Sequence, residues 1–146
     1  MYRKILLPTD GSALCETATA RGIEFAKFAG ASVVGFHAIP ATSYLIYTEA
    51  GPSDVLAEQF ERDAVARGER LVQAMADRAQ AAGVHCETLT LVNDHPWEGI
   101  IEAAATKGCD LIFMASHGRK GLSALLLGSE TTKVLTHTKV PVLIYR

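Results

Sequence analysis

Short apolar runs alternate with longer amphipathic segments along the chain, and this alternation restricts the fold more than any other feature. The runs are four to six residues long and span Lys4 to Leu7, Ser32 to Phe36, Glu87 to Val92, Leu111 to Met114 and Val140 to Tyr145. Most are continuously apolar, as in strands that are covered on both faces. Strands that alternate with helices form parallel sheets with crossover connections, so we expect an α/β fold.

The segments between these runs have apolar residues at helical spacing. The expected helices are Leu14 to Ala29 ended by Gly30, Asp54 to Ala82 followed by Gly83, a short helix that begins at Pro96, and Glu130 to Thr136. Gly30 suits a left-handed C-cap, and Pro96 suits a first helical position. In the long second helix, steps of three and four predict a buried face that includes Leu56, Phe60 and Met75.

The length and composition favour one globular domain over residues 1–146. Two domains would each have a marginal core, and 49% apolar residues are enough to build a single one. The net charge of −2 and the scattered basic residues give no reason to expect a nucleic-acid or acidic-membrane partner. The first residues lack the apolar core of a signal peptide, and no run is long enough to span a membrane, so we expect a cytoplasmic protein.

The three cysteines, Cys15, Cys86 and Cys109, are widely spaced and form no C-x-x-C pair. This pattern predicts buried or half-buried free thiols and supports neither a disulfide framework nor a zinc site.

Two features of the chain point to contacts outside the core. The connection from Ile39 to Ser53 has no helical or strand period, and loops of this length are often functional. Its residues Tyr44 to Tyr47 either cover a ligand or a partner subunit or pack on the domain itself. In the last apolar run, Pro141 cannot donate a ladder hydrogen bond, which predicts an edge strand. Because apolar edges are usually covered, we predict a homodimer that buries Val140 to Tyr145 or the surface beside it.

A glycine-rich segment, ASHGRKGLSALLLGS, occupies residues 115–129. Gly118 stands where positive φ, or a ligand close to the backbone, would exclude a Cβ atom. Gly128 and Ser129 precede the last helix, whose N–H groups and dipole favour an anion such as a phosphate. The alternatives are a simple turn at Gly118 and a helix cap at Ser129. The segment matches neither the Walker A motif nor G-x-G-x-x-G.

The sequence PTDGS, residues 8–12, directly follows the first apolar run, as the glycine-rich segment directly follows the fourth. In open α/β sheets, ligands bind beyond the carboxyl ends of the strands, where the strand order reverses. If the first and fourth strands are neighbours there, Asp10 and the glycine-rich segment face each other across one cleft. Asp10 would then accept hydrogen bonds from ribose hydroxyls, or alternatively stabilise a turn or helix cap.

These segments together resemble the universal stress protein family over essentially the full length. The resemblance rests on PTDGS, on His37 and Ala38 at the end of the second run, and on ASHGRKGLSALLLGSETTKVL followed by VPVLIY. The family's ATP-binding pattern, G-x-x-G-x9-G-[ST], would span Ala115, Gly118, Gly128 and Ser129. Ala115 replaces the first glycine, and its methyl group is harmless in β backbone but crowds the phosphates if positive φ is needed.

The resemblance implies a Rossmann-like open parallel sheet of five strands, in the order 3-2-1-4-5, with helices on both faces and dimerisation through the fifth strand. It also implies a site for ATP or another adenine nucleotide, with or without Mg²⁺. The implied site residues are Pro8, Thr9, Asp10, Ala38, Met114, Ala115, His117, Gly118, Gly128, Ser129 and Glu130. Asp10 would bind the ribose, Ala38 would touch the adenine, and the glycine-rich segment would bind the phosphates. The carboxylate of Glu130 would repel phosphates unless it points away or shares a Mg²⁺.

No catalytic residue or metal ligand is assigned, because the sequence shows no Ser-His-Asp arrangement, catalytic carboxylate pair or metal cluster. We expect His117 to be a backbone-positioning or solvent-facing residue, His37 a hydrogen-bonded core residue, and Trp97 a packing residue at a helix start. Arg119 and Lys120 either screen phosphate charge or are simply solvated.

The leading hypothesis is therefore a regulatory dimer that binds ATP in a stress response and is not an enzyme. One alternative is slow ATP hydrolysis or phosphotransfer to a hydroxyl such as that of Ser123 or Ser129. The other alternative is a protein-interaction module with no nucleotide in its cleft.

Overall fold

A computed structural model of the chain describes residues 1–41, 47–48, 51–118 and 126–146. Five parallel strands form one sheet in the order β5-β2-β1-β6-β7. The strands are β1 (Lys4–Pro8), β2 (Ser32–Ile39), β5 (Cys86–Val92), β6 (Leu111–Ala115) and β7 (Val142–Tyr145). Numbered along the chain, these five strands have the order 3-2-1-4-5, so the predicted fold class and topology are confirmed.

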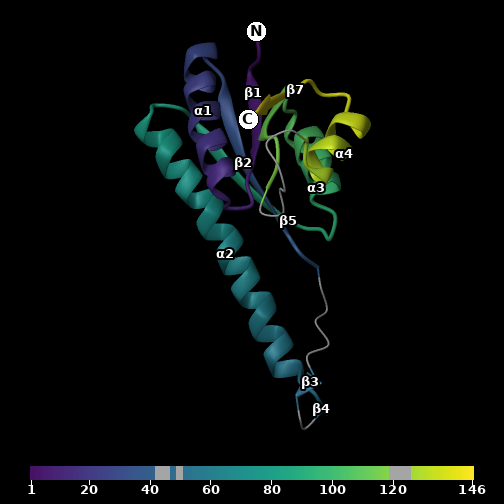
Figure 1. Cartoon of the computed structure of the whole chain (residues 1–146). Coiled ribbons are helices and arrows are strands. Elements are labelled where there is room, and N and C mark those ends of the chain that lie inside the picture. Colours follow the sequence, from purple (N-terminus) through teal and green to yellow (C-terminus); the bar gives the residue numbers. More distant parts are fainter. Residues whose placement is uncertain (42–46, 49–50, 119–125) are drawn as a thin grey trace.

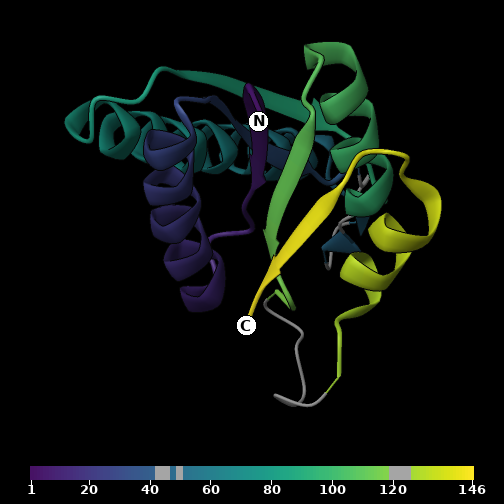
Figure 2. The same ribbon diagram turned by 90° about the horizontal axis from the view of Figure 1, so that it is seen from above.

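Two helices cover each face of the sheet (Figure 2). The helices α1 (Ala13–Ala29) and α2 (Asp54–Ala81) lie on one face, and α3 (Pro96–Lys107) and α4 (Ser129–His137) lie on the other. The strand residues alternate between the two cores: Ile5 and Leu7 pack toward α1 and α2, whereas Leu6 packs toward α3 and α4. Strands that are buried on both faces explain the continuous apolar runs in the sequence.

Local signals in the sequence set the ends of the helices. The hydroxyl of Ser12 caps α1 by accepting from the N–H of Cys15 at 3.4 Å, and Gly30 ends this helix in the left-handed conformation. Pro96 occupies the first turn of α3, as predicted. The cysteines are free thiols, two of them buried and Cys86 half-buried, which is also as predicted.

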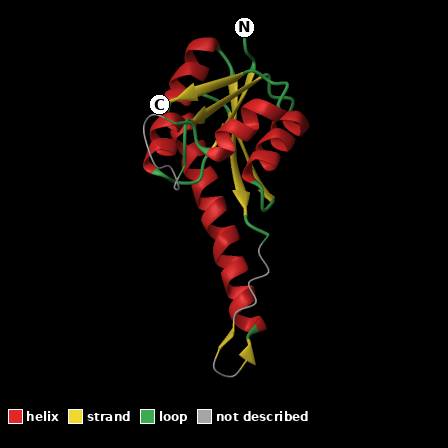
Figure 3. Cartoon of the chain, turned by 45° about the vertical axis from the view of Figure 1, so that its right-hand side comes forward, coloured by secondary structure: helices red, strands yellow, loops and turns green. Residues whose placement is uncertain are grey.

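The helix α2 extends well beyond the sheet (Figures 1 and 3). Its fully buried residues are Gly68, Val72, Met75 and Ala79, which all belong to its C-terminal half. The prediction that Leu56 and Phe60 are buried is wrong, because their side chains are 37% and 54% exposed. Helical spacing shows which residues share a face, but it does not show where the sheet that covers this face ends.

A small antiparallel pair, β3 (Tyr47–Thr48) and β4 (Gly51–Pro52), lies at the tip of α2 (Figure 1). No strand was expected in this connection, because its sequence has no strand period. Residues 44–46, which were considered as a cover for a ligand or partner, lie outside the described residues. Within the described part of the chain, no helix is long and apolar enough to cross a membrane.

The strand β7 lies at an edge of the sheet, as Pro141 predicted. It begins after this proline, whose carbonyl oxygen still accepts from the N–H of Ile112 at 2.9 Å. Four residues further along, the carbonyl oxygen of Tyr145 accepts from the N–H of Ser116 at 2.8 Å. Since backbone groups alternate sides along a strand, those of Val142 and Ile144 point toward the open edge.

Candidate functional site

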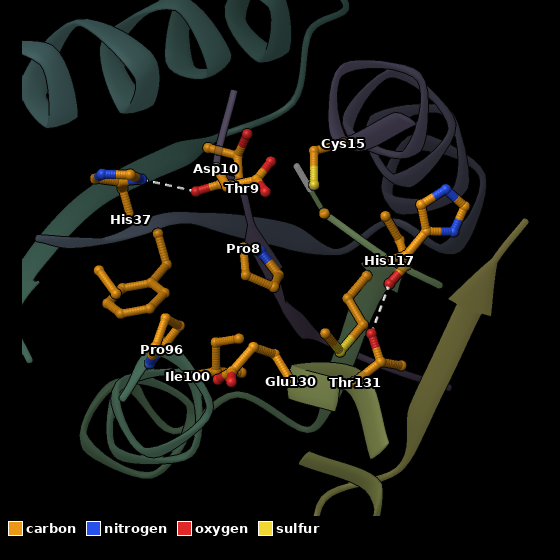
Figure 4. Close-up of a pocket in the computed structure, with 15 residues that line it drawn as sticks. Pro8, Thr9, Asp10, Cys15, His37, Pro96, Ile100, His117, Glu130 and Thr131 are labelled. Atoms are coloured by element: carbon orange, nitrogen blue, oxygen red, sulfur yellow. Dashed lines mark hydrogen bonds between the residues drawn. The ribbon is translucent and has the colours of Figure 1, made fainter. Parts of the chain in front are cut away.

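A cavity of about 150 Å³ lies at the carboxyl ends of β1 and β6, between which the strand order reverses (Figure 4). This is where ligands bind in open α/β sheets. Most of its wall is apolar. The lining residues are Pro8, Thr9, Asp10, Cys15, Phe36, His37, Ala38, Pro96, Ile100, Met114, Ala115, His117, Gly118, Glu130 and Thr131.

The bend after β1 is held by its own side chains. The hydroxyl oxygen of Thr9 accepts from the N–H of Gly11 at 3.1 Å, and the carboxylate of Asp10 accepts from the N–H of Ser12 at 2.9 Å. The carbonyl of Thr9 accepts from Nδ1 of His37 at 2.8 Å, which ties the bend to β2. Asp10 therefore has the turn-stabilising role that was considered as an alternative, and His37 is the hydrogen-bonded core residue that was predicted.

The bend after β6 meets this first bend directly. A Cβ atom added to Gly118 would collide with the Oδ2 atom of Asp10. The reason for glycine here is close approach, because the backbone of Gly118 does not have positive φ. The structure thus brings Asp10 and the glycine-rich segment together at one cavity. Ala115 is the last residue of β6 and does not have positive φ, so its methyl group causes no strain.

Gly128 is the N-cap of α4, and its N–H donates to the carbonyl of Ser116 at 2.8 Å. A Cβ atom on Gly128 would lie 3.1 Å from the Cα atom of His117, so packing favours glycine. The alternative in which Ser129 caps this helix is wrong, since Ser129 is already its first helical residue. Neither Gly128 nor Ser129 lines the cavity itself, but they directly precede Glu130 and Thr131, which do.

The start of α4 has no side-chain cap. The first N–H groups of a helix have no partner within the helix, and together with the helix dipole they attract anions. The hydroxyl of Thr131 donates to the carbonyl of Ala115 at 3.2 Å, which ties this first turn to the end of β6. The arrangement can therefore hold an anion beside the cavity.

The carboxylate of Glu130 points toward α3. Its Oε2 atom accepts from the backbone N–H of Trp97 at 2.9 Å, and its Oε1 atom lies 3.6 Å from Nζ of Lys133. The indole of Trp97 packs on the ring of His137 with a centroid distance of 4.6 Å. Trp97 is thus half-buried at a helix start, as predicted.

His117 is half-buried at the cavity, and its Nδ1 atom lies 3.1 Å from the hydroxyl oxygen of Ser116. The segment that follows, which includes Arg119, Lys120, Gly121 and Ser123, lies outside the described residues. Among the residues that are described, the lining contains no lysine or arginine.

The family model for the universal stress protein family matches residues 1–146. The chain belongs to the universal stress protein family. A universal stress protein of Thermus aquaticus is 35% identical over the full length of both chains. Among solved structures, that of MJ0577 from Methanocaldococcus jannaschii superposes with a TM-score of 0.81 at 27% identity, covering 99% of this chain and 95% of the other.

Two further solved universal stress proteins were determined with adenine nucleotides. One, in complex with cAMP, has a TM-score of 0.72 at 24% identity and covers 99% of this chain and 97% of the other. The other, from Arabidopsis thaliana with AMP bound, has a TM-score of 0.68 at 18% identity and covers 97% of this chain and 90% of the other. At these identities the likeness shows a shared fold.

Six lining residues of this universal stress protein are absent from the predicted site: Cys15, Phe36, His37, Pro96, Ile100 and Thr131. Of these, His37 was predicted only as a core residue. A signal existed for Pro96 and Ile100, because the helix that they begin follows a strand ending at the same edge of the sheet. Cys15 lies in the first turn of α1. Burial raises the pKa of its thiol to about 11, so this thiol is neutral at physiological pH and forms part of the apolar wall.

Proposed function

We propose that this universal stress protein is a regulatory protein that binds ATP in the cavity between β1 and β6. The observation that carries the proposal is the meeting of Asp10 and Gly118 at the mouth of this cavity, beside the uncapped start of α4. The carboxylate of Asp10 would then face the ribose of a nucleotide, and the N–H groups at the start of α4 would face its phosphates.

The base would occupy the apolar cavity. A volume of about 150 Å³ suits a planar aromatic ring rather than a whole nucleotide. Pro8, Ala38, Ile100 and Met114 supply apolar walls for such a ring. The ribose and the phosphates would then lie at the open side, toward Asp10 and α4.

The ribose hydroxyls would donate to the carboxylate of Asp10, and the phosphates would accept from N–H groups of Gly118 and of the first turn of α4. Charge-assisted hydrogen bonds of this kind are the strong ones. Among the described residues, no group of three or more metal-binding side chains is present. We therefore propose that any Mg²⁺ enters with the phosphates rather than binding to a site formed by the protein.

We also propose that two copies pair through the open edge of β7. The outward backbone groups of Val142 and Ile144 would form hydrogen bonds to the same strand of the second copy. The dimer would then change its shape or its protein partners when the nucleotide binds.

Isothermal titration of the purified chain with ATP, ADP, AMP and adenosine tests the proposed binding. We expect one nucleotide per chain, and the Asp10→Ala variant should raise the Kd of ATP by about tenfold or more. The Asp63→Ala variant is the control, because it removes an equal charge from an exposed position on α2. Absence of binding by the unmodified chain would contradict the proposal and favour a protein-interaction module. Bound ATP that is hydrolysed within minutes would favour the enzyme alternative.

A further inference from the structure

The N-terminus of α3 lacks the usual cap. Pro96 has no N–H group, so Trp97 carries the first backbone donor of this helix. The N-cap residue, His95, makes no side-chain cap hydrogen bond. Unsatisfied donors at a helix start require an acceptor from elsewhere in the molecule or from water.

Glu130 supplies this acceptor from a different helix. Its Oε2 atom lies 2.9 Å from the N atom of Trp97, although 33 positions separate the two residues in sequence. A carboxylate at this place also gains from the positive end of the α3 dipole. Glu130 belongs to the first turn of α4, so a single side chain links the starts of two helices.

Trp97 contacts α4 a second time, at its other end. The indole packs on the ring of His137, the last residue of this nine-residue helix. Trp97 thus contacts both ends of α4, and the fully buried Val134 lies between these contacts. The position of the first turn of α4 therefore depends on its attachment to α3.

From these contacts we infer that Glu130 is a positioning residue for phosphate binding, which caps α3 and thereby holds the N–H groups of α4 in place. This inference rests on the proposed function. The opposite expectation is simple charge repulsion, because a carboxylate in the wall of a phosphate site disfavours phosphates. The two accounts predict opposite effects when the carboxylate is removed.

Three variants separate the accounts. Glu130→Ala removes both the charge and the acceptor, whereas Glu130→Gln removes the charge and keeps an oxygen that can accept from Trp97. Glu98→Ala is the control, because it removes an exposed carboxylate from the first turn of α3 that does not bind the N–H of Trp97. The Kd values for ATP and for adenosine, which has no phosphates, are measured by isothermal titration for each.

If Glu130 positions α4, Glu130→Ala should raise the Kd of ATP about tenfold and leave that of adenosine within about twofold, since loss of a cap loosens only the phosphate end. Glu130→Gln and Glu98→Ala should keep the Kd of ATP within about threefold of the unmodified chain. The amide proton of Trp97 should also exchange faster with solvent in Glu130→Ala and not in Glu130→Gln.

Tighter ATP binding by both Glu130 variants would overturn the inference in favour of repulsion. Unchanged ATP affinity in Glu130→Ala, with faster exchange at Trp97, would also overturn it, because the cap would then exist without positioning the phosphate site. If the unmodified chain binds neither ligand, the proposed function itself fails, which distinguishes that outcome from the other two.

Discussion

At the scale of single residues, the contact between Asp10 and Gly118 determines what the site can bind. A Cβ atom at position 118 would displace the carboxylate of Asp10, so Gly118→Ala should weaken ATP binding by moving the group that contacts the ribose. We expect the Kd of ATP to rise about tenfold.

A double-mutant cycle checks this cause. In the Asp10→Ala background the added methyl group has no carboxylate to displace, so Gly118→Ala should then change the Kd of ATP little. Effects of the two substitutions that simply add in free energy, as measured by titration calorimetry, would contradict the proposed coupling.

Contacts between single residues could be predicted from the sequence where the strand order determines which residues meet. Asp10 and Gly118 each follow a strand, and the two strands are neighbours, so their meeting was predictable. The bond from Glu130 to Trp97 was not, because it depends on how α3 and α4 pack on each other. The N-cap at Gly128 was missed for a similar reason, since its contact with His117 depends on the path of the whole loop.

At the scale of elements, α2 has two halves with different surroundings. Val72 is 5% exposed and packs on the sheet, whereas Val55 is 72% exposed on the extension. We expect Val72→Ala to lower the free energy of unfolding by about 1.5–3 kcal/mol, because it removes buried methyl groups and leaves a cavity. Val55→Ala should change it by less than about 0.5 kcal/mol.

Chemical denaturation of the two variants measures both values. The same side-chain atoms are removed at both positions, so the two variants compare a buried with an exposed valine of one helix. Equal decreases in the free energy of unfolding for Val72→Ala and Val55→Ala would contradict this account, because they would show that the extension is packed as tightly as the rest of α2.

The elements themselves were largely predictable. All five strands and four helices of the main fold were expected from apolar patterning, with ends that differ by a few residues. The exposure of the start of α2 could not be predicted, because Phe60 has the same helical spacing as Met75, which is buried. The pair β3–β4 was missed because two-residue strands are too short to show an alternating pattern.

At the scale of the whole molecule, the proposed dimer depends on the backbone of β7. Ile144→Pro removes an N–H group that points to the open edge, without removing a hydrogen bond to β6. We expect this variant to be a monomer of 15.6 kDa by light scattering, whereas the unmodified chain has twice that mass.

Ile144→Ala is the matched control, because it also loses the side chain but keeps the N–H group. It should remain a dimer. A dimer that persists in Ile144→Pro would place the interface elsewhere on the molecule.

The proposed site requires that the bend after β1 and the first turn of α4 contact the same nucleotide. Backbone amide chemical shifts of the isotope-labelled chain during an ATP titration test this claim most directly. We predict the largest changes at residues 9–12 and 128–131, with the exposed start of α2 unaffected. Changes confined to only one of these two segments, or located elsewhere in the chain, would contradict it.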